Sequence, residues 1–280
     1  MIYLLIATLC FSFSFGLIKS QIATLPVNIV VFWRLLIASL IFLPVFAQNF
    51  KLIKFTQIKN AFLIGILQFG IMYICFLRAF KYLQGNEIVL LTATTPIFVI
   101  LVSSIFSKKF NWYFLLCALL AVFGAIIVAL GTTTPQMLLK GVIYMELSNI
   151  TFATGQILWQ KFISERSENL MFPAYFSAAC FVLPFACMSN FETFNPTNLQ
   201  WLSILYLAIV PTGLGFWLWA KGLQQVSGVL LAVMNNLKIP FGVLFAILIF
   251  NENTNIPNFI IGFSLILLAI ICSYILDKKN

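Results

Sequence analysis

The sequence contains no histidine, and only 8% of its 280 residues are charged. Soluble domains carry roughly 25% charged residues, so this composition excludes an ordinary water-soluble fold. Six cysteines are present but form no C-x-x-C pair, so we expect no metal site and no disulfide framework. The chain also lacks a G-x-x-x-x-G-K-[ST] loop and any recognisable nucleophile–base pair. We therefore expect neither an ATP-driven pump nor an enzyme, and no cofactor.

Hydrophobic residues dominate instead, at 62% of the chain. A helix crosses a bilayer in about 20 residues, and the alternating pattern of a membrane barrel is absent. The sequence therefore predicts an all-α membrane protein with ten transmembrane helices. The expected spans lie near residues 2–21, 27–47, 58–81, 86–107, 112–131, 138–162, 170–190, 199–222, 226–250 and 256–276.

The net charge of +9 comes from basic residues that are scattered at the edges of the apolar runs. Scattered lysines and arginines are typical of topology signals, and a nucleic-acid surface would cluster them, so no nucleic-acid partner is expected. Most of them fall on one side if the N-terminus is cytoplasmic. We expect an integral, multi-pass protein of the plasma (inner) membrane with both termini in the cytoplasm.

An internal repeat relates the two halves of the chain. The segment LLTATTPIFVIL aligns with AVMNNLKIPFGVL, which places Pro96 over Pro240 as corresponding helix breaks. The repeat predicts two five-helix units, residues 1–134 and 135–280, in one integral membrane body. Because five is odd, the second unit must enter the membrane from the opposite side, giving the inverted repeats of many secondary transporters.

The stretches FWRLLIASLIFLP, TPIF and IPFGVLFAILIFNE, in a ten-span chain of this length, resemble the EamA group of the drug/metabolite transporter superfamily. The resemblance covers essentially the whole chain. It implies a carrier of small metabolites, since many members export amino acids and related compounds.

Three ionisable residues, Arg34, Glu146 and Lys238, lie deep inside predicted spans. Charges there cost roughly 2.5–3.5 kcal/mol each on insertion scales and mark functional pathways. We expect Lys238 to bind an anionic part of the substrate. Glu146 is the candidate for proton coupling, and it lies at a depth that would allow an ion pair with Lys238. Arg34 either contributes to the site or extends its head toward the outer interface.

Amides at helical spacing suggest a polar cavity between the sixth and ninth spans. Glu146, Asn149, Gln156 and Gln160 form one stripe, and Asn235 and Asn236 lie beside Lys238. Hydrogen bonding between neighbouring helices is an equally good explanation for the amides. Trp217 either stacks on the substrate or packs in the core. The candidate substrate-binding residues are Lys238, Asn235, Asn236, Glu146, Asn149, Gln156, Arg34 and Trp217.

The favoured function is a secondary transporter of small polar metabolites, amino acids or related compounds, which exports them by alternating access. An uptake carrier for a nucleoside-like or cofactor-like solute is the alternative. A non-transporting membrane scaffold or receptor is the alternative from another class, but it would leave the polar stripe unexplained. The expected partners are a small-molecule substrate, the lipid bilayer and protons; the oligomeric state stays open.

Overall fold

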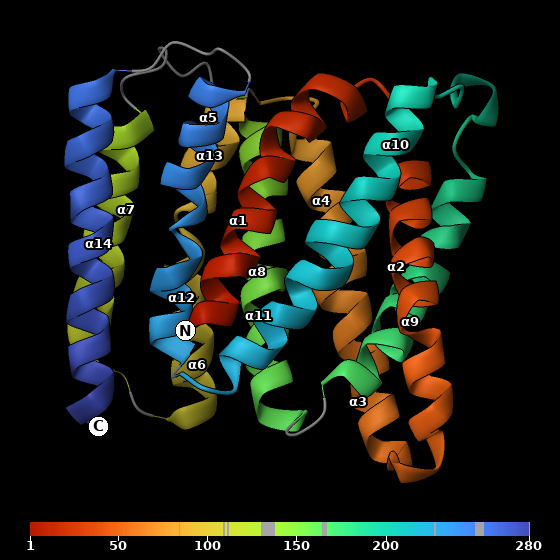
Figure 1. The fold of residues 1–280 in the computed structure, drawn as a ribbon, viewed down its shortest axis with the longest axis horizontal. Coiled ribbons are helices and arrows are strands. Elements are labelled where there is room, and N and C mark those ends of the chain that lie inside the picture. The colour runs from red at the N-terminus through yellow and green to blue at the C-terminus, as the bar shows by residue number, and fades with distance from the viewer. Residues whose placement is uncertain are drawn as a thin grey trace.

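A computed structural model describes residues 1–83, 85–108, 110, 112–129, 138–163, 167–226, 228–249 and 255–279. Within these ranges the regular structure is helical throughout, and the helices form ten rods that stand side by side (Figure 1). The rods are α1–η1 (Ile2–Leu17, Ile18–Ile22), α2 (Val27–Asn49), α3–η3–α4 (Phe55–Gly65, Ile66–Ile71, Met72–Ala79), α5–α6 (Gly85–Thr92, Thr95–Ser107), α7 (Trp112–Ala129), α8 (Leu139–Phe162), α9 (Glu168–Cys187), α10–η5–α11 (Asn198–Leu207, Ala208–Gly215, Phe216–Leu223), α12–α13 (Gly228–Asn235, Lys238–Leu248) and α14 (Ile256–Lys279).

The rods have the lengths and surfaces of membrane helices. Seven described rods are long and apolar enough to cross a bilayer, and α7 is a shorter apolar helix. The polar α8 and the interrupted α12–α13 complete the ten crossings that the sequence predicts. Large aliphatic side chains remain exposed on the outside of the bundle, as with Ile105 at 74% and Leu139 at 73%. Lipid is the solvent in which such a surface is stable.

The packing of the rods repeats between the two halves. Two pairs of equivalent helices pack directly on each other, α2 on α9 and α7 on α14. The other contacts come in matched sets: α3 packs on α9 as α10 packs on α2, and α4 packs on α8 as α11 packs on α1. Likewise α6 packs on α8 as α13 packs on α1. The architecture is therefore two five-helix repeats, as the aligned prolines predict.

The repeats run in opposite directions. In Figure 1 α1 rises from the lower half of the bundle to its upper end, whereas its equivalent α8 starts at the upper end and descends. The chain begins and ends toward the same end, which an even number of crossings requires. The predicted boundary between residues 134 and 135 falls outside the described residues.

Equivalent rods are irregular at equivalent places. The third and eighth spans contain the π-helical segments η3 and η5. The fourth and ninth spans break into two helices, at Ala93–Thr94 and at Asn236–Leu237. Pro96 and Pro240 follow the breaks and lie in the first turn of α6 and α13, where a helix tolerates proline because these N–H groups have no partner in the helix. Both breaks border the cavity described next.

Candidate functional site

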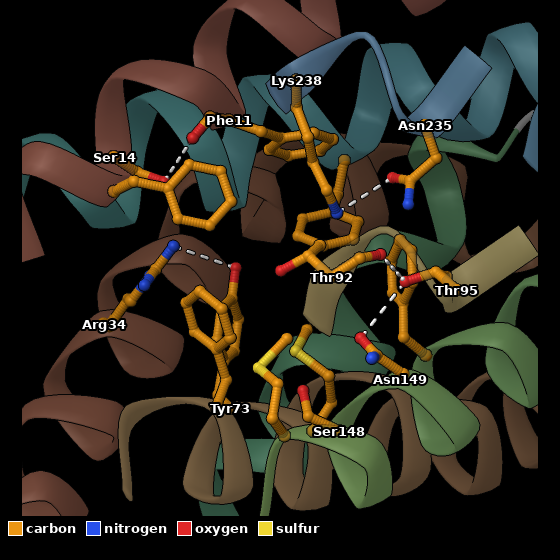
Figure 2. A pocket seen from close by; sticks show the side chains of 16 residues that line it. Phe11, Ser14, Arg34, Tyr73, Thr92, Thr95, Ser148, Asn149, Asn235 and Lys238 are labelled. Carbon is orange, nitrogen blue, oxygen red and sulfur yellow. Dashed lines mark hydrogen bonds between the residues drawn. The ribbon is translucent and has the colours of Figure 1, made fainter. Parts of the chain in front are cut away.

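A cavity lies at the centre of the bundle, between helices of both repeats (Figure 2). It holds about 540 Å³ of empty space, open space at its mouth included. Its polar lining is Ser14, Arg34, Tyr73, Thr92, Thr95, Ser148, Asn149, Asn235 and Lys238. Its apolar lining is Phe11, Phe15, Met72, Phe76, Met145, Phe152 and Phe216. This mixture suits a small amphipathic ligand.

Lys238 and Asn235 meet in the cavity because the α12–α13 break lies between them. Lys238 is 8% exposed, and its Nζ donates to Asn235 Oδ1 at 3.2 Å. The same ammonium lies 5.6 Å from the ring centroid of Phe152. Asn235 is fully buried, and its Nδ2 has no hydrogen-bond partner among the described residues. The Lys238 ammonium and the Asn235 amide are therefore neighbouring donors with hydrogens that no described partner engages.

Arg34 forms a second cationic centre, and it is only 2% exposed. Its Nε donates to Thr212 Oγ1 at 2.6 Å, and its Nη2 donates to the Tyr73 hydroxyl at 3.0 Å. The guanidinium carbon also lies 4.1 Å from the Tyr73 ring centroid. The Tyr175 hydroxyl donates to the Thr212 carbonyl and so helps to hold this cluster. Nη1 has no partner in the described part of the chain.

The cavity is electrically unbalanced. Its described lining contains two cations, Arg34 and Lys238, and no acidic residue. Their described hydrogen-bond partners are hydroxyl and amide groups, which carry no charge. A buried charge without a counter-ion is costly, so the arrangement favours an anion that enters with the ligand.

Four of the eight candidate residues line this cavity: Arg34, Asn149, Asn235 and Lys238. Arg34 is thus directed into the protein and does not extend toward the outer interface as one interpretation held. The other four candidates lie outside the cavity wall, and each has a different environment.

Glu146 faces the α5–α6 break. Its Oε2 accepts hydrogen bonds from Thr94 Oγ1 at 2.9 Å and from Asn149 Nδ2 at 3.2 Å. Asn149 Nδ2 also contacts the Leu91 carbonyl at 2.8 Å, and its Oδ1 accepts from Thr95 at 3.1 Å. Within the described residues Glu146 forms no ion pair with Lys238. The carboxylate of Glu146 is instead engaged by Thr94 and Asn149 at the break.

The polar stripe on α8 is therefore not one continuous cavity lining. Gln156 is fully buried away from the cavity, and neither polar atom of its side chain has a partner in the described ranges. Gln160 Nε2 donates to the carbonyls of Leu223, the last residue of α11, and Val226, each at 3.1 Å. Since α8 packs on several different rods along its length, only its middle turns reach the cavity.

Asn236 and Trp217 also lie away from the cavity. Asn236 is fully buried, and its Nδ2 donates to the Ala93 carbonyl at 3.2 Å. This contact joins the α12–α13 break to the α5–α6 break. Trp217 is half-buried, with the Lys221 ammonium 4.3 Å from its ring centroid.

Several residues that line the cavity were not predicted from the sequence. Thr92 and Thr95 stand in the segment LLTATTPIF beside the break, so their hydroxyls offered a usable signal. Ser148 is next to the identified Asn149. The lining phenylalanines had no such signal, because nothing in the sequence separates them from the other members of a set of 31.

Comparisons with known proteins agree with this architecture. The sequence model of the EamA-like transporter family matches residues 1–130 and 139–275. The chain is 33% identical to a "Probable biotin transporter" of Pseudomonas aeruginosa over 275 residues, which cover 96% of this chain and 95% of that protein. It is 32% identical to a "Biotin transporter" of Escherichia coli over 275 residues, covering 96% and 91%. A solved crystal structure shares the fold, with a TM-score of 0.77 at 16% identity, covering 99% of this chain and 98% of that one.

Proposed function

The chain belongs to the EamA-like transporter family, and from this premise we propose that it carries biotin, or a closely similar carboxylate, across the plasma membrane. The single observation that carries the proposal is the central cavity, whose described lining has two buried cations and no acid. Biotin has a carboxylate on an aliphatic chain and an uncharged ring system with a ureido group. The cations match the carboxylate, the aromatic walls match the aliphatic chain, and the amides match the ureido group.

The same cavity argues against free amino acids as substrates. An amino acid carries an ammonium group, which needs an acceptor of high electron density when it leaves water. The described lining provides no carboxylate, and Glu146, which accepts hydrogen bonds from Thr94 and Asn149 at the α5–α6 break, is not part of it. The names of the relatives also favour the cofactor-like alternative over the expected amino-acid export.

Transport then proceeds by alternating access. The two repeats meet at the cavity, and movement of one repeat against the other opens it to either side of the membrane. Both termini lie in the cytoplasm in this proposal, and substrate moves inward. The energy comes from a gradient, with Glu146 as the group through which protons act on the α5–α6 break.

Uptake of labelled biotin into proteoliposomes tests the proposal. Purified protein should give saturable uptake that unlabelled biotin competes away and that free amino acids leave unchanged. A Lys140→Met variant is the matched control, because it removes an exposed lysine at the start of α8, outside the cavity. Uptake no faster than in protein-free vesicles would overturn biotin as the substrate.

A further inference from the structure

We infer that the two cations of the cavity have different tasks: Arg34 holds the substrate carboxylate, whereas Lys238 and Asn235 hold the carbonyl oxygen of its uncharged head. The inference rests on the proposed function and deepens it, because it sets the orientation of the substrate. It also reverses the expectation that Lys238 binds the anionic group.

The two centres lie on opposite sides of the cavity. Figure 2 shows Arg34 and Ser14 on one side, and Lys238 with Asn235 on the other. Aromatic and methionine side chains occupy the space around and between them. A ligand that contacts both centres must therefore be polar at each end and apolar between, as biotin is.

Arg34 is built to receive a carboxylate. A guanidinium stays protonated at any relevant pH and offers five N–H donors in a rigid plane. The hydroxyls of Thr212 and Tyr73 engage two of these donors and fix the plane. Nη1 is left without a partner in the described structure, and Nη2 keeps a second hydrogen. These two nitrogens form the fork that binds a carboxylate bidentately.

Lys238 and Asn235 are suited to a neutral acceptor. The ammonium uses one described hydrogen bond, to Asn235 Oδ1, and Asn235 Nδ2 has none. Both groups therefore have hydrogens that no described partner engages, and the two side chains lie next to each other in the cavity wall (Figure 2). A ureido oxygen accepts two hydrogen bonds, and the hydroxyls of Thr92 and Ser148, which also line the cavity, can accept from the ureido N–H groups.

The reverse orientation leaves a larger penalty. With the carboxylate at Lys238, the permanently charged Arg34 would stay buried with only neutral partners. A buried arginine without a counter-ion costs more free energy than a buried lysine, because arginine cannot become neutral. With the carboxylate at Arg34, the fixed charge of the guanidinium is compensated, and Lys238 has the strongly dipolar ureido oxygen as its partner.

Competition binding with two analogues distinguishes the ends. Biotinamide replaces the carboxylate by a neutral amide. Iminobiotin replaces the ureido by a cyclic guanidine, which is positively charged at neutral pH. Affinities of biotin and both analogues are measured on purified wild type, Arg34→Gln and Lys238→Met, with Lys140→Met as the control for loss of a lysine.

Each variant should lose a different preference. Wild type should prefer biotin over both analogues by about 10- to 100-fold, the range expected for losing a charged hydrogen bond. Arg34→Gln should bind biotin and biotinamide alike but still reject iminobiotin. Lys238→Met should keep its preference for biotin over biotinamide and lose most of its rejection of iminobiotin, because the repelling cation is gone.

The opposite pattern overturns the assignment: loss of the acid–amide preference in Lys238→Met, or its retention in Arg34→Gln. If Arg34→Gln does not fold, the affinities of Lys238→Met for biotin and the two analogues still distinguish the two orientations. That variant removes a buried charge with no counter-ion among its described neighbours, so its fold should survive. Wild type that binds no biotin at all would instead reject the proposed function, and the orientation with it.

Discussion

The two broken helices occupy equivalent places in the two repeats, but their polar side chains are paired very differently. At the α5–α6 break, Thr94, Glu146 and Asn149 bond to one another, and Asn149 also holds the Leu91 carbonyl. At the α12–α13 break, Asn235 Nδ2 has no partner within the described residues, and Lys238 has one described hydrogen bond. The same backbone interruption thus gives one closed polar centre and one open one.

This difference separates polar side chains that stabilise the fold from polar side chains that are available to a ligand. The repeat alignment places Thr94 against Lys238, so a hydroxyl in one copy corresponds to a buried ammonium in the other. A buried polar group left unpaired costs about 1–3 kcal/mol. A ligand that satisfies the open break recovers this free energy, whereas the closed break has little left to gain. Substrate affinity should therefore depend on α12–α13, and stability on α5–α6.

The largest expected effect is on stability, when the asparagine at one break or the other is replaced by leucine. Asn149→Leu removes the hydrogen bonds of Nδ2 to the Leu91 carbonyl and to Glu146 Oε2, and the one that Oδ1 accepts from Thr95, so it should lower the free energy of unfolding by about 2–4 kcal/mol. Asn235→Leu removes one described hydrogen bond, the one that Oδ1 accepts from Lys238 Nζ, together with an Nδ2 that has no described partner, so it should cost less. Thermal unfolding of both variants without substrate measures the contrast. Equal destabilisation would erase the difference between the breaks.

The next largest effect concerns substrate affinity at the aligned positions. Lys238→Met should weaken biotin binding by about 10- to 100-fold, as expected for removing a charged donor. Thr94→Val should leave affinity near the wild-type value, because Thr94 does not line the cavity. Equilibrium binding to detergent-purified protein gives both values. A larger loss in Thr94→Val than in Lys238→Met would contradict the assignment of ligand binding to the second break.

A smaller effect is expected where the breaks touch. Asn236→Ala removes the hydrogen bond to the Ala93 carbonyl and should cost about 1 kcal/mol of stability. Because Asn236 joins parts of both repeats and lies outside the cavity, the rate of uptake should change while biotin affinity stays the same. Uptake kinetics and equilibrium binding, measured on one preparation, separate the two. A parallel change in affinity would indicate that Asn236 acts on the substrate site.

The smallest effect on binding is expected for Glu146→Gln, which keeps the shape of the side chain and removes its charge. Affinity should hardly change, since Glu146 lies outside the cavity wall. If Glu146 couples protons to movement of the α5–α6 break, stimulation of uptake by a pH gradient should disappear while exchange continues. The test is uptake with and without an imposed gradient in both proteins. An unchanged response would remove Glu146 from the coupling mechanism.

The sequence was sufficient for the architecture, because bilayer thickness sets the length of each apolar run and the aligned prolines reveal the repeat. It also identified four of the polar residues that line the cavity. Arg34, Asn149, Asn235 and Lys238 stand out because such side chains are costly within a span. Their depth along the helix follows from counting residues.

The direction in which each side chain points around its helix axis cannot be obtained by counting residues. Glu146 and Asn149 are three residues apart and share a face, but only Asn149 reaches the cavity, because the α5–α6 break covers Glu146. Asn235 and Asn236 are neighbours, and they point to different surroundings. The π-helical segment that carries Thr212 to Arg34 has no sequence signature that periodicity detects. These details depend on which rods pack together.

A structure of the protein with biotin bound would locate both ends of the substrate at once. We expect biotin in the central cavity, with its carboxylate on Arg34 and its ureido oxygen within hydrogen-bond distance of Lys238 Nζ and Asn235 Nδ2. The bonds among Thr94, Glu146 and Asn149 should be unchanged. Biotin bound outside this cavity, or held by Glu146 and the α5–α6 break, would contradict the assignment of substrate binding to Arg34 and the α12–α13 break.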